Sequence, residues 1–277
     1  SRPVLATELC DILGIEYPIM LAGMGVWGMG TPPELVAAVS EAGGCGVLGG
    51  SALSPEEVRR RIRRVRQLTD KPFGVDLLLP ASLATASTTR TGVREELAKN
   101  HPEHVKFMHG LLERFELTPA PVENDIVNSD EYAEAQIQVV LEEEVPIFAA
   151  GLGDPARIIP RARKQGMLVI GLAGTVRHAE RNRDAGVDLV VCQGTEGGGH
   201  TGPVATLPLV AQSVAAISPV PVVAAGRLTG GRGLSAALAL CAILVCLGPA
   251  FPVAELRRLL ARVPSARLAC LPTPFLL

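Results

Sequence analysis

The sequence predicts an α/β protein with a (β/α)8 TIM-barrel fold, and three observations support this. Short apolar runs rich in β-branched residues alternate with amphipathic segments of helical period. The runs are apolar almost throughout, as expected for parallel strands packed on both faces. Small residues end most of the runs, namely Gly23, Gly49, Gly151, Gly171 and Gly226. An open doubly wound sheet is the competing fold, but in a barrel these ends meet on one face, where active sites are built.

The first three strands are expected over residues 17–25, 42–50 and 71–80. Thr31 and Ser54, each followed by proline, mark the starts of the two helices between them, because a hydroxyl at the N-cap and proline at the first helical position both favour a helix start. The chain therefore opens with regular strand and helix units.

This alternation is interrupted between residues 81 and 139, where a Ser/Thr-rich loop leads into the charged stretch 94–115. We expect an inserted helical segment between strands three and four that covers one end of the barrel, because long connections in compact domains are usually lids or linkers. Its histidines, His101, His104 and His109, are interpreted as surface residues rather than metal ligands, and no metal site is expected.

The alternation then returns over the second half of the chain. Strands four to seven are expected over residues 145–151, 167–171, 187–192 and 220–226, with helices over 155–165, 176–185 and 207–217.

Composition limits the classes of protein that this chain can belong to. With 277 residues, 48% of them hydrophobic, it can bury one large core. The 26 basic and 28 acidic residues give a formal net charge of −2, so no nucleic-acid partner is expected. One cluster is basic and is interpreted as the solvated face of a helix: Arg59, Arg60, Arg61, Arg63, Arg64 and Arg66.

Cysteine usage and hydropathy indicate a cytoplasmic protein. The six cysteines form no C-x-x-C pair and lie mostly in apolar runs, which fits reduced, buried thiols, and Cys192 is expected to pack at a strand end. We recognise no secretory leader. The longest apolar run, residues 234–248, is too short to span a bilayer, so no membrane partner is expected.

Residues 190–202, V-V-C-Q-G-T-E-G-G-G-H-T-G, carry the clearest functional signal. A buried strand stops there at three consecutive glycines, Gly197 to Gly199, followed by His200. Glycines let the backbone approach a planar or phosphorylated ligand, and their amides can point at anionic oxygens. His200 is the one side chain of this loop able to move a proton near neutral pH. The pattern predicts the rim of an active site.

Four segments together resemble the FMN-dependent nitronate monooxygenases, formerly called 2-nitropropane dioxygenases. Residues 18–24 resemble the family's P-I-x-x-x-x-M strand, and residues 193–202 its Q-G-x-E-x-G-G-H-x-G loop. Residues 221–227 resemble P-V-x-A-A-G-G-I, and residues 231–240 the helix G-R-G-x-x-A-A-L-A-L. Their order and spacing agree over about residues 3–240, and the glycine–histidine loop is the specific part.

The resemblance implies which residues contact FMN. Backbone at the end of the first strand would pack on the flavin ring, Asp76 would lie near the ring or ribityl chain, and Gln193 would hydrogen-bond the flavin. For Asp76, capping of strand three is an equal alternative. Glycines of two loops would approach the ring and donate to the phosphate. The implied cofactor-binding residues are Ala22, Gly23, Met24, Asp76, Gln193, Gly198, Gly199 and Gly226.

The implied reaction is the oxidation of alkyl nitronates or nitroalkanes by dioxygen to carbonyl compounds and nitrite. His200 would be the base, because the nitro group makes the α-carbon proton acidic enough for a neutral imidazole to remove. FMN would carry the redox chemistry. Glu196 is interpreted as a residue that shapes the loop. A homodimer is a further expectation.

Three departures from the family pattern leave alternatives open. Arg227 stands where relatives have glycine and would either pair with or clash with the FMN phosphate. In the eighth strand, residues 241–251, Gly248 matches a phosphate-binding glycine, but Pro249 offers neither hydroxyl nor amide. We expect residues 1–251 to form the FMN-binding barrel and residues 252–277 an atypical or truncated apolar tail that invites association.

The competing functions are an enoyl-acyl-carrier-protein reductase or an NAD(P)H:quinone reductase of the same barrel group, and a degenerate barrel without turnover. Consumption of NADH or NADPH would identify the reductases. Failure to retain FMN would identify the degenerate barrel.

Overall fold

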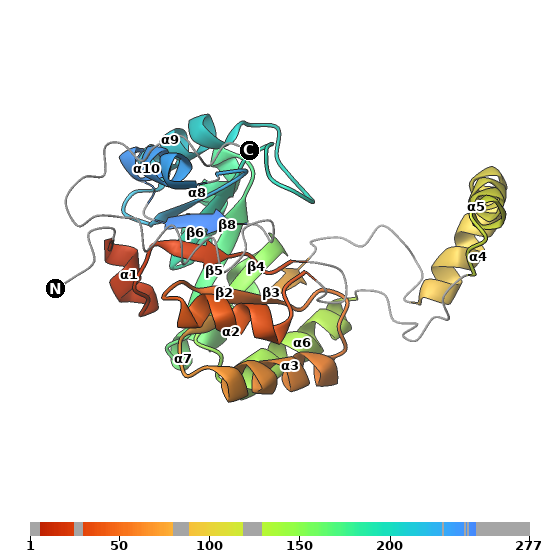
Figure 1. The fold of residues 1–277 in the computed structure, drawn as a ribbon, viewed down its shortest axis with the longest axis horizontal. Helices are drawn as coiled ribbons and strands as arrows, with labels where there is room; N and C mark the ends of the chain where they lie inside the picture. Colours follow the sequence, from red (N-terminus) through yellow and green to blue (C-terminus); the bar gives the residue numbers. More distant parts are fainter. Residues whose placement is uncertain are drawn as a thin grey trace.

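The computed structural model describes residues 6–24, 30–79, 89–118, 129–228, 230–240, 242 and 244–247. Within these ranges the chain folds as helices around a parallel sheet (Figure 1). The α/β class predicted from the alternation is confirmed. Gly248, Pro249 and the tail 252–277 lie outside the described residues.

The sheet contains eight strands among the described residues, in the order β1-β8-β7-β6-β5-β4-β3-β2, and every neighbouring pair is parallel. Backbone hydrogen bonds also join its two ends, since Cys45 donates to Ile19 (2.9 Å) and Leu21 donates to Cys45 (2.8 Å). The strands are β1 Ile19–Leu21, β2 Gly46–Gly49, β3 Phe73–Leu79, β4 Ile147–Gly153, β5 Leu168–Ala173, β6 Leu189–Gln193, β7 Val222–Ala225 and β8 Leu244–Leu247.

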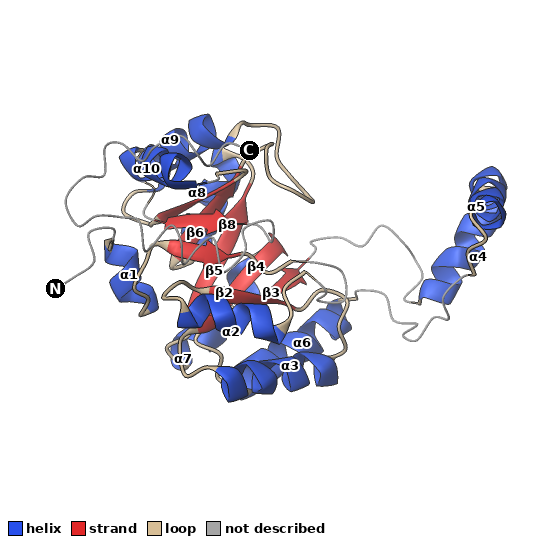
Figure 2. Cartoon of the chain, viewed as in Figure 1, coloured by secondary structure: helices blue, strands red, loops and turns tan. Residues whose placement is uncertain are grey.

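The helices that follow these strands form an outer layer over the curled sheet (Figure 2). Alternation along each strand sends one set of side chains outward to these helices, as with Phe148 of β4 and Ile62 of α3. The outer helices are α2 Pro33–Glu41, α3 Pro55–Leu68, α6 Asp130–Glu142, α7 Ile159–Lys164, α8 Val176–Ala185, α9 Thr206–Ile217 and α10 Gly230–Ala239, with the 3-10 turn η2 Pro155–Arg157 before α7.

A second hydrophobic cluster fills the inside of the sheet. It receives side chains from β1, β2, β4, β5, β6 and β7, among them Met20, Ile147 and Val191. Strands that point residues into one shared cluster must curve around it. Leu9 and Leu13 of helix α1 (Glu8–Leu13) join this cluster, so α1 closes one end of the interior. The carboxyl ends of the strands are left for the loops that carry the site.

Helix α3 shows how local sequence sets an element and where the prediction was incomplete. Ser54 Oγ accepts a hydrogen bond from the amide of Glu57 (3.1 Å), as the predicted N-cap requires. Its arginines were expected to be merely solvated, which is wrong in part. Arg59 and Arg63 each lie 2.9 Å from the carboxylate of Glu143, which is only 8% exposed and follows α6 directly. These ion pairs tie α3 to its neighbour.

The inserted segment contains two helices, α4 Arg90–Asn100 and α5 Pro102–Arg114. They pack on each other and stand apart from the sheet in Figure 1, so the expected cover over one end of the barrel is not what these helices form. Helix α6, which the insertion was expected to include up to residue 139, instead belongs to the outer layer and buries Ile137 and Val140 against the sheet. No described helix is both long and apolar enough to cross a membrane.

Candidate active site

Asp76 lies on the inner face of β3, near its carboxyl end. Alternation sends Val75 and Leu77 outward to the helices, so Asp76 points inward between them. It lies against two glycines: a Cβ added to Gly23 would fall 2.4 Å from the Asp76 Cβ, and one added to Gly151 would fall 2.6 Å from its Oδ1. Contacts of that length do not occur, so both positions must lack a side chain. We call Gly23, Asp76 and Gly151 the Asp76 cluster.

The carboxyl group of Asp76 is buried and has a raised pKa. Its Oδ1 is buried without a hydrogen-bond partner among the described residues, which typically costs about 1–3 kcal/mol. Burial raises the pKa of this carboxyl to about 8, and the amide of Gly151 opposes the rise only in part. At pH 7 the group is therefore mainly protonated and neutral. The alternative role of Asp76, capping of strand three, would need a hydrogen bond to its carboxyl, and Oδ1 forms none with a described residue.

Thr31, fully buried, fixes the loops after β1 and β2. Its Oγ1 accepts hydrogen bonds from the amides of Gly49 (2.9 Å) and Met24 (3.2 Å) and lies 3.3 Å from the carbonyl of Met24. This hydroxyl sets the position of Met24, one of the expected cofactor contacts. Sequence reasoning used Thr31 only as a helix start and missed this role.

The glycine loop after β6 is held in shape from within. Gln193 Nε2 donates to the carbonyls of Gly198 (2.9 Å) and His200 (3.4 Å). A Cβ at Gly197 would fall 2.7 Å from this nitrogen, so glycine is needed there. Gln193 thus organises the loop, and its hydrogen bond to a flavin stays a prediction.

Glu196 anchors the same loop to helix α9. Its Oε2 accepts hydrogen bonds from the amide (2.9 Å) and Oγ1 (2.7 Å) of Thr206, the first residue of α9, and these bonds lower the pKa of the Glu196 carboxyl. A carboxylate at a helix N-terminus is favourable. The interpretation of Glu196 as a loop-shaping residue is confirmed.

Thr206 also joins the loops after β6 and β7. A Cβ at Gly226 would fall 2.1 Å from Thr206 Oγ1, and one at Gly194 would fall 2.3 Å from the same atom. The amide of Gly194 donates to the carbonyl of Ala225 (3.0 Å). Two glycines of the predicted motifs are therefore required by packing around Thr206, a residue that sequence reasoning did not single out.

His200, Gly198 and Gly199 form the open side of the loop. All three are exposed, and no described residue forms a hydrogen bond with the His200 ring. A Cβ at Gly198 or Gly199 would meet nothing within 4 Å. This part of the loop is thus free to contact a ligand, and the imidazole has both nitrogens available for proton transfer.

Gly226 and Arg227, at the end of β7, both have positive φ angles, +131° and +46°. Arginine rarely adopts this conformation, because holding a residue other than glycine in it costs about 1–3 kcal/mol of conformational free energy. The Arg227 side chain is exposed and has no ion pair with any described residue. An unpaired guanidinium on a backbone turn that favours glycine suits an anionic ligand.

Cys192 lies in the hydrophobic core beneath the site. The thiol is buried, and burial raises its pKa to about 11, while the nearby Ser213 hydroxyl opposes the rise in part. A thiol held neutral in this way is a poor nucleophile. Its expected packing role agrees with these surroundings.

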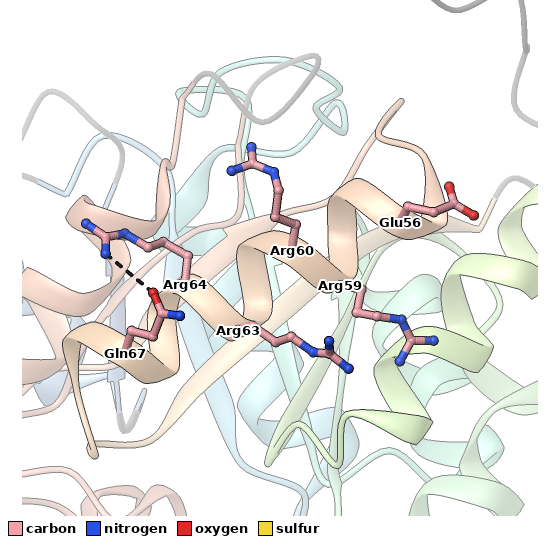
Figure 3. A pocket seen from close by; sticks show the side chains of 6 residues that line it. All are labelled: Glu56, Arg59, Arg60, Arg63, Arg64 and Gln67. Carbon is pink, nitrogen blue, oxygen red and sulfur yellow. Dashed lines mark hydrogen bonds between the residues drawn. The ribbon is translucent and has the colours of Figure 1, made fainter.

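Two polar clusters lie elsewhere. His101, Glu103 and His104 at the start of α5 are all exposed, as expected for the two histidines, and their ligand atoms lie within 4.8 Å of one another. On the outer face of α3, a surface cavity of about 370 Å³ is lined by Glu56, Arg59, Arg60, Arg63, Arg64 and Gln67 (Figure 3). Arg60 and Arg64 there are already paired with Glu57 and Glu34.

The contacts thus bring the expected site residues into two groups. One is the Asp76 cluster, with Met24 held beside it by Thr31. The other joins Gln193, the glycine loop and Gly226 through Thr206. Both stand at the carboxyl ends of parallel strands, which is where α/β enzymes bind their ligands.

Comparison with known proteins finds relatives that are similar to this chain in sequence and solved structures that are similar in fold. A monooxygenase-named protein of Mycobacterium tuberculosis is 38% identical, over 85% of this chain and 63% of its own length. A protein of Staphylococcus saprophyticus named "Probable nitronate monooxygenase" is 33% identical, over 89% of this chain and 68% of its own. The solved nitroalkane oxidase of Streptomyces ansochromogenes superposes with a TM-score of 0.70 at 30% identity, over 87% of this chain and 67% of that one.

These relatives are longer than this chain, which spans about two thirds of their length. The sequence profile described as nitronate monooxygenase matches residues 6–256, and so includes both groups of site residues. With that match, and identities of 30–38% to proteins of similar fold, the chain belongs to the nitronate monooxygenase family.

Proposed function

We propose that this protein uses FMN to oxidise alkyl nitronates or nitroalkanes with dioxygen, forming carbonyl compounds and nitrite. The observation that carries the proposal is the junction of the loops after β6 and β7 at Thr206. There an open glycine loop with His200 stands next to a positive-φ turn that presents an unpaired arginine. Family membership supplies the class of reaction.

The described residues suit FMN in three respects. Gly198 and Gly199 have open space beside them, which leaves room for a planar ring. Arg227 offers an unpaired cation for the phosphate, with Gly226 and the start of α10 close in sequence. Asp76 offers a buried carboxyl whose Oδ1 lacks a partner. Ala22, Gly23, Met24, Gln193, Gly248 and Pro249 complete the proposed set.

In the proposed mechanism His200 takes the α-carbon proton of a neutral nitroalkane. An imidazole without an internal partner can accept this proton directly, and a preformed nitronate would not need it. Bound FMN would supply the electron transfer between the nitronate and dioxygen, which amino-acid side chains cannot perform. Gln193 and Glu196 hold the loop so that His200 faces the substrate.

The finer fold assignments belong to the same proposal. We infer that the eight strands form a complete (β/α)8 barrel over residues 1–251, closed by the hydrogen bonds between β1 and Cys45. We also infer a cytoplasmic protein, because Cys10 and Cys192 are buried thiols outside any disulfide. We further infer a homodimer, for which the exposed apolar face of α5 is the surface.

The test is the visible spectrum of the purified chain before and after addition of FMN, followed by anaerobic addition of a nitronate. A bound flavin that the nitronate reduces supports the proposal. Flavin that is reduced by NADH or NADPH but not by nitronate would instead indicate one of the reductases. No binding after reconstitution would indicate a barrel without turnover.

A further inference from the structure

The strongest unexplained feature is the enclosed carboxyl of Asp76. Its walls are backbone: β2 and β4 pair with β3 on either side, so that Asp76 lies next to Gly49 and Ala149 in register. Gly23 and Gly151 close in from the ends of β1 and β4, and any side chain on them would overlap the carboxyl. A carboxyl enclosed this closely, whose buried Oδ1 has no hydrogen-bond partner among the described residues, points to a ligand that supplies one.

Within the part of the chain that the structure describes, no charged group acts on this carboxyl. None of the packed strand segments, Ile19–Leu21, Gly46–Gly49 and Ile147–Gly153, contains an ionisable residue, and Asp76 is the only one in Phe73–Leu79. The residues that continue β1 and β3, 22–29 and 80–88, contain none either. A further titratable group, the buried thiol of Cys45, lies just before β2. Burial therefore acts on Asp76 without an opposing cation, and it raises the carboxyl pKa to about 8.

We propose that Asp76 works as a neutral carboxylic acid that donates a hydrogen bond to the bound flavin, so that Asp76 must carry its proton whenever the cofactor is bound. The inference rests on the proposed function and deepens it. The flavin atom that accepts this hydrogen bond is an uncharged acceptor on the ring or ribityl chain. An ionised Asp76 would repel the lone pair of that atom, so the hydrogen bond needs the protonated carboxyl. Asp76 is a cofactor-binding residue in this role.

The proposal predicts how affinity depends on pH. Below the carboxyl pKa the donor is present and flavin affinity is constant. Above it the proton must be regained on binding, so the dissociation constant should rise about tenfold between pH 7 and pH 9. The same site loaded at pH 7 should release flavin when the pH is raised.

Fluorescence titration with riboflavin provides the test, because riboflavin lacks the phosphate, whose own titration and pairing with Arg227 would complicate FMN data. Wild type should show the tenfold loss. Asp76→Asn, an isostere that keeps an N–H donor at every pH, should bind with a constant within about twofold from pH 7 to pH 9. Asp76→Leu, which has no donor, should bind about tenfold more weakly at pH 7 and also without pH dependence.

An infrared difference spectrum of the ligand-free protein between pH 6.5 and 9.5 reports the same proton independently. Wild type should lose a protonated-carboxyl band that Asp76→Asn lacks. Flavin binding that is independent of pH in wild type, or equally dependent in Asp76→Asn, would overturn this inference and leave the proposed function intact. If neither the wild type nor any variant binds riboflavin or FMN, both this inference and the proposed function are wrong.

Discussion

At the scale of single residues, Arg227 combines an unfavourable backbone conformation with a charge that has no ion pair among the described residues. Its φ of +46° suits glycine or asparagine far better than arginine. If the guanidinium binds the FMN phosphate, Arg227→Asn should stabilise the ligand-free protein by up to about 1 kcal/mol while weakening FMN about tenfold. Thermal unfolding and fluorescence titration measure the two effects separately.

Riboflavin and Arg227→Lys serve as matched controls for this residue. Riboflavin affinity should be unchanged in Arg227→Asn, because it has no phosphate to lose. Arg227→Lys keeps the charge and should retain most of the FMN affinity. Equal weakening of both flavins would mean that the substitution distorts the turn and that no phosphate contact exists.

His200 is tested by comparing two forms of one substrate. His200→Ala should reduce turnover of a neutral nitroalkane by about 10² to 10⁴, the usual range for a lost general base. Turnover of the preformed nitronate should stay within a few fold, because that substrate has already lost its proton. Oxygen consumption with each form measures the ratio, and full activity of His200→Ala with the nitroalkane would exclude His200 as the base.

Sequence patterns identified the glycines of the site but not the threonines that require them. Gly194 and Gly226 stand out in the sequence, whereas their shared neighbour Thr206 lies 12 and 20 residues away from them and belongs to no motif. Thr31 is hidden in the same way behind its position at a helix start. Contacts between loops of different strands depend on the folded sheet, and a linear pattern cannot reveal them.

At the scale of elements, the loop after β6 and helix α9 behave as one unit through Glu196 and Thr206. Thr206→Val removes the buried hydroxyl through which α9 binds the loop after β6. This substitution should lower the free energy of unfolding by about 1–3 kcal/mol. The glycine loop should loosen as well, so flavin affinity should fall. Thr206→Ser keeps the hydroxyl and should recover most of both losses, as measured by denaturant unfolding and flavin titration.

Elements whose partners are close in sequence were predicted well, and those with distant partners were not. The N-cap at Ser54 and the stripe Val58, Ile62 and Val65 gave α3 correctly. The ion pairs from Arg59 and Arg63 to Glu143 join residues about 80 positions apart, so no periodicity of α3 could reveal them. Charge alternation within one helix says only that a face is polar.

At the scale of the whole molecule, alternation of strands and helices predicted the parallel sheet because each unit folds on local signals and must pack on the next. The extent of the insertion was less accessible. Helix α6 follows a polar stretch like that of α4 and α5, and only its burial against β3 separates it from them. Burial is a property of the assembled chain.

The insertion also carries the clearest sign of association. Helix α5 buries no residue, yet Phe107 is 68% exposed and Met108 51%, with Phe115 and Leu117 beyond its end also exposed. Exposed apolar groups gathered on one element mark an interaction surface. We expect the protein to form a homodimer through this surface, and Phe107→Gln with Met108→Gln to weaken dimerisation at least tenfold in analytical ultracentrifugation.

Lys106→Gln, on the same helix, is the control and should leave the dimer unchanged, because it alters charge without removing apolar area. A wild type that is monomeric at all concentrations would contradict the homodimer. If the double variant then also unfolds more easily, the apolar face of α5 packs within its own chain, because burial there would contribute to the stability of the monomer.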